Sequence, residues 1–132
     1  MKPIYKAGLL FLAILMVIFA ASVTLKKGNR KVAGEENTLY SGVATVRITK
    51  DGFFPEEIRV TKGTTVIFEN KDEYWHWPAS DIHPSHSIYP EFDPGGAIGP
   101  GKNWEFIFDR VGEWGYHDHL SPYIVGKIIV IE

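Results

Sequence analysis

Residues 58–68, IRVTKGTTVIF, decide the fold class of this chain. Ile58-Arg59-Val60 and the run from Thr64 to Phe68 are rich in β-branched and aromatic residues, which favour strands. Lys62-Gly63 between them is typical of a tight turn. The stretch therefore predicts two short strands rather than a helix.

Similar β-type runs lie on both sides of this stretch. They occupy residues 43–48, 104–108, 113–116 and 127–131. Gly and Pro separate them, and no helical periodicity of useful length follows residue 26. The pattern predicts an all-β domain, an antiparallel β-sandwich or barrel.

Residues 69–102 break this pattern, because they are rich in Pro and contain few strand signals. A loop of this length in a small domain is usually functional or disordered. The histidines in this loop favour a functional loop over a disordered one. All five His of the chain lie between residues 76 and 119, at His76, His83, His86, His117 and His119.

Neutral imidazole is the commonest protein ligand for copper and zinc. An isolated His is usually a surface or core residue, but this clustering is not expected from random placement. His83 and His86 lie three residues apart around Pro84, and strand alternation places His117 and His119 on one face. The sequence therefore predicts a metal site that uses at least three of the five.

Asp118 lies between the last two histidines and points to the opposite face of the strand. It could face His76 while the other four histidines meet one another, or support a ligand His. The residues alone leave open whether there is one site or two. The candidate ligands are His76, His83, His86, His117, His119 and Asp118.

The composition excludes several kinds of chemistry. The chain has no Cys, so it has no disulfide, thiolate ligand or cysteine nucleophile. The aromatic run Tyr74-Trp75-His76-Trp77 lies among acidic residues rather than among Lys and Arg, which argues against nucleic acid.

The N-terminal segment predicts a link to a membrane. Residues 7–25, AGLLFLAILMVIFAASVTL, carry no charge and are long enough to span a bilayer. Ala20-Ala21-Ser22 also fits signal-peptidase cleavage, so an anchor and a cleaved signal both remain open. The expected organisation is an anchor or signal helix in residues 1–25, a polar tether in 26–40 and the β domain in 41–132.

The two charge signs are separated along a chain whose formal net charge is -2. Six Lys and Arg precede the first acidic residue, Glu35, and all 16 carboxylates follow from there. We therefore expect a cationic N-terminal segment and an acidic domain on the extracytoplasmic face, membrane-anchored, or secreted if the signal is cleaved.

The region from Ala44 to Glu132 resembles a cupredoxin domain. The resemblance lies in FPEEIRVTKGTTV at residues 54–66, in ENKD at 69–72 ahead of His76, in FDPG at 92–95 and in GEWGYH at 112–117. It implies a Greek-key β-sandwich. Of the family's type 1 copper ligands only His76 is present, since Asp118, Ser121 and Ile124 stand where Cys, His and Met are expected.

The segment Tyr116-His117-Asp118-His119 is also similar to the Tyr-His-x-His motif of multicopper oxidase domains. His76-Trp77 resembles the start of their His-Trp-His motif, with Pro78 in place of its second His. In those enzymes such imidazoles bind the oxygen-reducing copper cluster.

We expect a membrane-tethered cupredoxin-like protein that binds Cu(II), with zinc as the alternative, through a His-rich site. Its role would be copper binding, delivery or electron transfer, with a redox or copper-delivery protein as partner and no catalytic residue assigned. Two alternatives remain. One is a small multicopper-oxidase-like enzyme assembled by oligomerisation, and the other is a metal-free surface interaction module.

Overall fold

The structure is a computed structural model that describes residues 38–132. This part of the chain is all-β and contains no helix. Its strands are β1 (Leu39–Tyr40), β2 (Val43–Thr49), β3 (Gly52–Phe54), β4 (Glu57–Thr61), β5 (Thr64–Asn70), β6 (Pro78–Ser80), β7 (Asn103–Phe108), β8 (Gly112–Asp118) and β9 (Ser121–Ile131).

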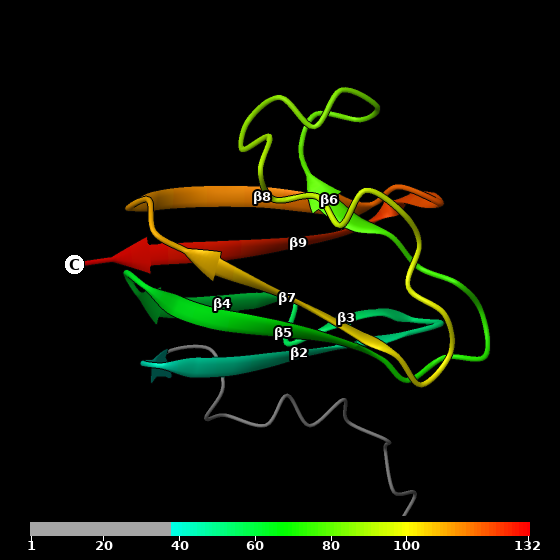
Figure 1. The fold of residues 1–132 in the computed structure, drawn as a ribbon, viewed down its shortest axis with the longest axis horizontal. Helices are drawn as coiled ribbons and strands as arrows, with labels where there is room; N and C mark the ends of the chain where they lie inside the picture. Colours follow the sequence, from blue (N-terminus) through cyan, green and yellow to red (C-terminus); the bar gives the residue numbers. More distant parts are fainter. Residues whose placement is uncertain (1–37) are drawn as a thin grey trace, which may run out of the picture. The chain divides into compact units, whose positions relative to one another are not determined.

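The strands form two sheets that lie face to face as a sandwich (Figure 1). One sheet has five strands in the order β1-β4-β9-β8-β6, and the other has four in the order β3-β2-β5-β7. The predicted β-sandwich is therefore confirmed. β1 lies just before Ser41, at the end of the segment expected to be the tether.

The prediction of an antiparallel arrangement was wrong in part. β2 pairs with β5, and β4 pairs with both β1 and β9, in parallel. The reason is that neighbours in a sheet are seldom consecutive in sequence. Between β2 and β5 the chain passes to the other sheet for β4, so it returns in the same direction.

The predicted anchor or signal in residues 1–25 and most of the tether lie outside the described residues. Within residues 38–132 there is no helix that is long and apolar enough to span a membrane.

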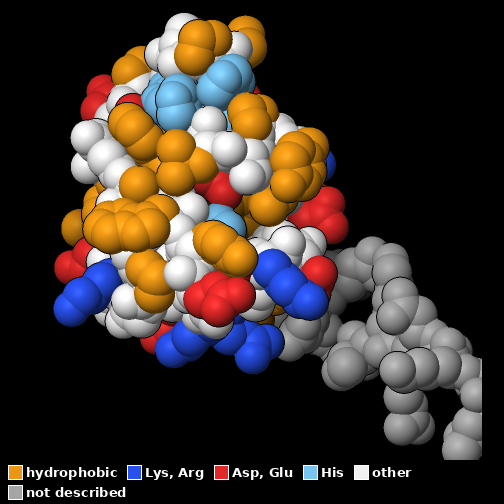
Figure 2. All heavy atoms as spheres, turned by 90° about the vertical axis from the view of Figure 1, so that its right-hand side faces the viewer, with side chains coloured by type: hydrophobic (Ala, Val, Ile, Leu, Met, Phe, Trp, Pro, Cys, Tyr) orange, Lys and Arg blue, Asp and Glu red, His pale blue; other side chains and the backbone are white. Residues whose placement is uncertain are grey.

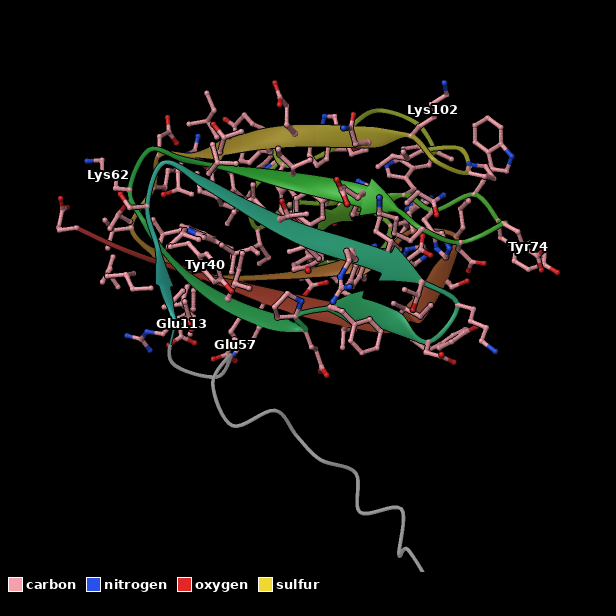
Figure 3. The ribbon with its side chains drawn as sticks, turned by 90° about the horizontal axis from the view of Figure 1, so that it is seen from below. Tyr40, Glu57, Lys62, Tyr74, Lys102 and Glu113 are labelled. Carbon is pink, nitrogen blue, oxygen red and sulfur yellow. The ribbon has the colours of Figure 1, made fainter. Side chains whose placement is uncertain are left out.

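The core lies between the two sheets, and alternation along the strands fills it. β2 and β5 bury every second side chain, among them Val46, Val66 and Phe68. Seen from below, side chains occupy the space between the sheets, with Tyr74 and Lys102 at one end and Lys62 at the other (Figure 3).

The hydroxyl of Tyr116 on β8 is buried in this core without a hydrogen-bond partner among the described residues. Burial raises the pKa of Tyr116, and the charge of Glu56 adds to the effect. A buried polar group without a partner costs about 1–3 kcal/mol. Tyr116→Phe is therefore expected to raise the free energy of unfolding by about 1 kcal/mol in denaturant titrations.

The matched control for Tyr116→Phe is Tyr89→Phe. The Tyr89 hydroxyl donates to Asp109 Oδ1 at 2.6 Å, so its removal should lower stability. If Tyr116→Phe lowers stability as Tyr89→Phe does, the account of the Tyr116 hydroxyl is wrong.

Candidate metal centre

A closed loop over the outer face of the five-stranded sheet carries half of the candidate site. It runs through residues 81–93 after β6, and Figure 1 shows it in yellow-green above β6 and β8. Ser80 anchors both ends, because its N–H donates to the Phe92 carbonyl at 2.9 Å and its Oγ accepts from the Tyr89 N–H at 2.8 Å. These bonds bring His83 and His86 over β8.

The other half of the site comes from the end of β8. His117 pairs with Ala79 of β6, and the register shifts at His117/Asp118, where the strand ends. The His119 N–H donates to the Trp77 carbonyl at 2.7 Å and so joins this segment to the chain entering β6.

These two segments bring four imidazoles together. One ring nitrogen from each of His83, His86, His117 and His119 lies within 4.8 Å of all the others. His83 Nδ1 is 3.3 Å from His117 Nε2, and His86 Nε2 is 2.9 Å from His119 Nδ1. Figure 2 shows pale-blue histidines gathered near the top of the domain among hydrophobic side chains.

Carboxylates orient two of these rings. His117 Nδ1 is 2.8 Å from Asp81 Oδ1, and His86 Nδ1 is 2.6 Å from Asp93 Oδ2. An ionised carboxylate only accepts, so each Nδ1 donates, and in a neutral imidazole ring this leaves the lone pair of Nε2 for the cluster. This arrangement of carboxylate and imidazole is typical of metal-binding His.

Asp93 is itself held in place. It accepts from Trp77 Nε1 and from the Gly95 N–H, both at 2.7 Å. Burial acts to raise the pKa of Asp93, but hydrogen bonds from Gly95, Trp77 and His86 outweigh it and hold this pKa below its usual value. Asp93 therefore stays ionised and able to orient His86 near neutral pH.

His86 has an unusual backbone conformation. Its φ is 51°, in the left-handed region that side chains other than Gly seldom adopt. Such a conformation costs of order 1–3 kcal/mol and persists where the surrounding structure imposes it, often at functional sites. The loop thus holds the His86 ring in the cluster at a cost in backbone energy.

The space among the four rings fits an ion rather than an organic molecule. A hollow of about 510 Å³ elsewhere in the domain is lined by residues that include Trp75, Ile98 and Trp104, and none of the four His lines it. Metal–nitrogen bonds of about 2.0–2.1 Å put ligand atoms roughly 3–4 Å apart, so closing the cluster around one ion needs ring movements of about 1 Å.

His76 and Asp118 lie apart from these four rings and pair with each other. His76 Nδ1 is 2.7 Å from Asp118 Oδ2, and its Nε2 is 3.1 Å from Asp72 Oδ2. The other oxygen of Asp118 accepts from the backbone N–H groups of Trp77 and Leu120 at 2.8 and 3.1 Å. Both ring nitrogens of His76 thus face carboxylates, and Asp118 is fully engaged.

The six candidate ligands therefore divide into a cluster of four His and a His–Asp pair. The sequence alone does not decide between one site and two. It also does not identify Asp81, Asp93 and Trp77 as the residues that support the four rings. The acidic residues of the His loop were the available signal, but their positions in the chain do not reveal which ring each one contacts.

The Asp72 carboxylate is expected to stabilise the fold at neutral pH and to lose this effect in acid. Burial acts to raise the pKa of Asp72, but hydrogen bonds from His76 and from the Glu73 backbone outweigh it and lower that pKa. A carboxyl with a lowered folded-state pKa stabilises the fold above its unfolded pKa, and this contribution is lost as the pH falls through the folded pKa. Asp72→Asn should therefore unfold more easily at neutral pH, with the difference from wild type shrinking below about pH 4.

Chemical unfolding across pH measures this effect. Asp51→Asn is the matched control, because Asp51 is exposed and its carboxylate makes no hydrogen bond within residues 38–132. Parallel stability curves for wild type and Asp72→Asn would contradict the prediction.

The two sheets and their order define a cupredoxin-like domain, and comparisons with solved structures agree. The purple cupredoxin from Nitrosopumilus maritimus is 23% identical, with a TM-score of 0.59, over 67% of this chain and 99% of that one. A Cu(I) form of an amicyanin variant is 22% identical, with a TM-score of 0.59, over 67% of this chain and 82% of that one.

The Cu-containing nitrite reductase from Thermus scotoductus SA-01 is 28% identical, with a TM-score of 0.57. The match covers 67% of this chain but 22% of the reductase, so this chain corresponds to a small part of that enzyme. No protein-family model and no curated protein matches the sequence.

A type 1 copper does not fit this chain. The chain has no Cys, and Asp118 stands where the resemblance expects one. Both carboxylate oxygens of Asp118 accept hydrogen bonds, one from His76 and the other from two backbone N–H groups. Since both ring nitrogens of His76 also face carboxylates, no free ligand atom of His76 remains there. The four-His cluster is the place in the described residues whose donor atoms fit a metal.

Proposed function

We propose that this chain binds copper as Cu(II) at the cluster of His83, His86, His117 and His119. The observation that carries the proposal is the convergence of four imidazole nitrogens, two of them on rings whose other nitrogen is oriented by a carboxylate. His76 and Asp118 then support the structure instead of binding the ion.

Copper is favoured over zinc on chemical grounds. Imidazole suits both ions, but a given nitrogen site binds Cu(II) more tightly than Zn(II). The copper named for the nitrite reductase and the amicyanin adds support by likeness of fold. Four ligands come from one chain, so oligomerisation is not needed to complete the site.

The biological role we propose is that of a membrane-tethered, extracytoplasmic protein that holds copper for delivery or electron transfer. The apolar residues 7–25 and the basic residues around them support the tether. A copper-delivery or redox protein is the expected partner.

Metal content and electron paramagnetic resonance of the full chain test this function. We expect one Cu(II) per chain, a spectrum with several nitrogen ligands, and no strong blue absorption because there is no thiolate. Copper at 100 times its Kd should also add about 2.7 kcal/mol to the stability.

The matched variants are His86→Ala/His117→Ala, which removes two ligands, and His76→Gln, which leaves all four. The first should lose specific copper binding and the second should keep it. If the double variant binds copper as wild type does, this site is not the copper site. If Zn(II) outcompetes Cu(II) in the wild type, the choice of metal is wrong.

A further inference from the structure

The four histidine rings differ in their burial and in the contacts that fix them outside the cluster. His117 and His86 are 2% and 6% exposed, and each has its Nδ1 on a carboxylate. His119 is half-buried, and its ring lies against the Trp77 indole with centroids 4.6 Å apart. These three rings have supports outside the cluster.

His83 lacks such support. It is exposed, and its ring contacts within residues 38–132 are with other members of the cluster, His117 at 5.1 Å and His119 at 4.7 Å between centroids. Its Nδ1 faces His117 Nε2 at 3.3 Å, the longer of the two nitrogen pairs in the cluster. Among the described residues, no carboxylate is hydrogen-bonded to this ring.

Exposed apolar side chains lie next in sequence to two members of the cluster. Ile82, beside His83, is 59% exposed, and Leu120, beside His119, is 51% exposed. An incoming neutral ring could therefore pack on His119 and His117 as the His83 ring does, without placing a charge against apolar surface.

We propose that His83 is an exchangeable ligand, and that copper is loaded and removed by an imidazole donor that takes its coordination position. The inference rests on the proposed copper site and extends it. In the exchange the bond from copper to His83 Nδ1 breaks and a bond to the incoming imidazole nitrogen forms, with no change of oxidation state. His86, His117 and His119 keep the ion during this step.

Three glycine variants of the full chain test the proposal: His83→Gly, His86→Gly and His117→Gly. Glycine suits position 86 because φ is already 51° there, so this substitution adds no backbone strain. Far-UV circular dichroism of the metal-free proteins checks that all three variants are folded. Copper affinity, paramagnetic resonance and the rate of copper transfer to a chelator are then measured with and without imidazole.

His83→Gly is expected to lower copper affinity by about tenfold or less. Loss of an anchored ligand should cost more than the roughly 10–100-fold that follows loss of a residue supporting a ligand. Added imidazole should return the His83→Gly spectrum to that of wild type and should not do so for His86→Gly or His117→Gly. In the wild type, imidazole should speed transfer to the chelator, because it competes with His83.

The donor could be a free imidazole or a His side chain of a partner, and a short peptide with one His is a second probe that distinguishes them. Equal losses in the three glycine variants, rescue of all three by imidazole, or a transfer rate independent of imidazole would overturn the inference. If the wild type binds no copper, the proposed function fails too. If it binds copper and the variants do not differ, only the exchange at His83 fails.

Discussion

Gly126→Ala is expected to lower the free energy of unfolding of this domain by about 3 kcal/mol or more. Gly126 on β9 lies directly opposite Tyr116 on β8. A Cβ at position 126 would overlap the Tyr116 ring and lie 2.5 Å from its hydroxyl oxygen. Real Cβ atoms do not approach this closely, so either the ring or the strand must move.

The ring has little freedom to move. Tyr116 is fully buried, and its centroid is 4.6 Å from that of Phe53, 5.5 Å from Phe68 and 5.4 Å from Phe92. Overpacking a well-filled core costs about 1–3 kcal/mol, and we expect the upper end, about 3 kcal/mol or more, because both strands are central. The midpoint of guanidinium unfolding measures it.

Gly96→Ala is the matched control, since nothing lies within 4 Å of a Cβ there and φ is not in the left-handed region. Its effect should stay within about 0.5 kcal/mol. Tyr116→Leu combined with Gly126→Ala should recover part of the loss, because the smaller side chain removes the overlap. Equal midpoints for the two alanine variants would show that the core accommodates the extra methyl group.

Asp118→Ala is expected to have the second large effect, on stability and on copper together. The carboxylate is fully buried and accepts from His76 Nδ1 and from the backbone N–H groups of Trp77 and Leu120. Its removal leaves three donors without their acceptor, one of them the buried ring nitrogen of His76. A buried donor left without its partner costs about 1–3 kcal/mol, so we expect a loss of about 3 kcal/mol for the three together.

We expect a lower copper affinity because Asp118 lies between two proposed ligands, His117 and His119, in the sequence. Its contact with the Trp77 backbone positions a residue whose ring lies on His119 and whose Nε1 holds Asp93. Loss of a supporting residue of a metal site typically costs 10–100-fold in affinity, and we expect about that for the folded Asp118→Ala protein.

Glu105→Ala removes an equal charge from an exposed position on β7 and controls for the change in net charge. Asp118→Asn keeps an oxygen for the two backbone donors, so it should lose less stability than Asp118→Ala. If copper affinity is unchanged in Asp118→Ala, the coupling from this carboxylate to the four-His cluster is absent.

Local patterns were enough to predict the sandwich, because alternation in β2 and β5 depends on residues close in sequence. The pairing of β2 with β5 in parallel was not predictable in this way. Strand direction within a sheet depends on which sheet the chain visits in between, and side-chain alternation is the same for parallel and antiparallel strands.

The same division applies to the candidate site. The positions of the five histidines are read directly from the sequence, and the facing of His117 away from Asp118 is a local property of strand alternation. His119 lies in the turn after β8, so strand alternation does not fix its direction. Because the sequence contains no Cys, composition alone shows that no thiolate can bind a metal here.

Only the tertiary structure decided how these residues group. The loop closed at Ser80 carries His83 and His86 over β8, while His76 passes to the other side of that strand and pairs with Asp118. It also assigned Asp81, Asp93 and Trp77 to particular rings. These contacts join residues up to 42 positions apart, and their geometry depends on packing between segments, which spacing along one chain does not encode.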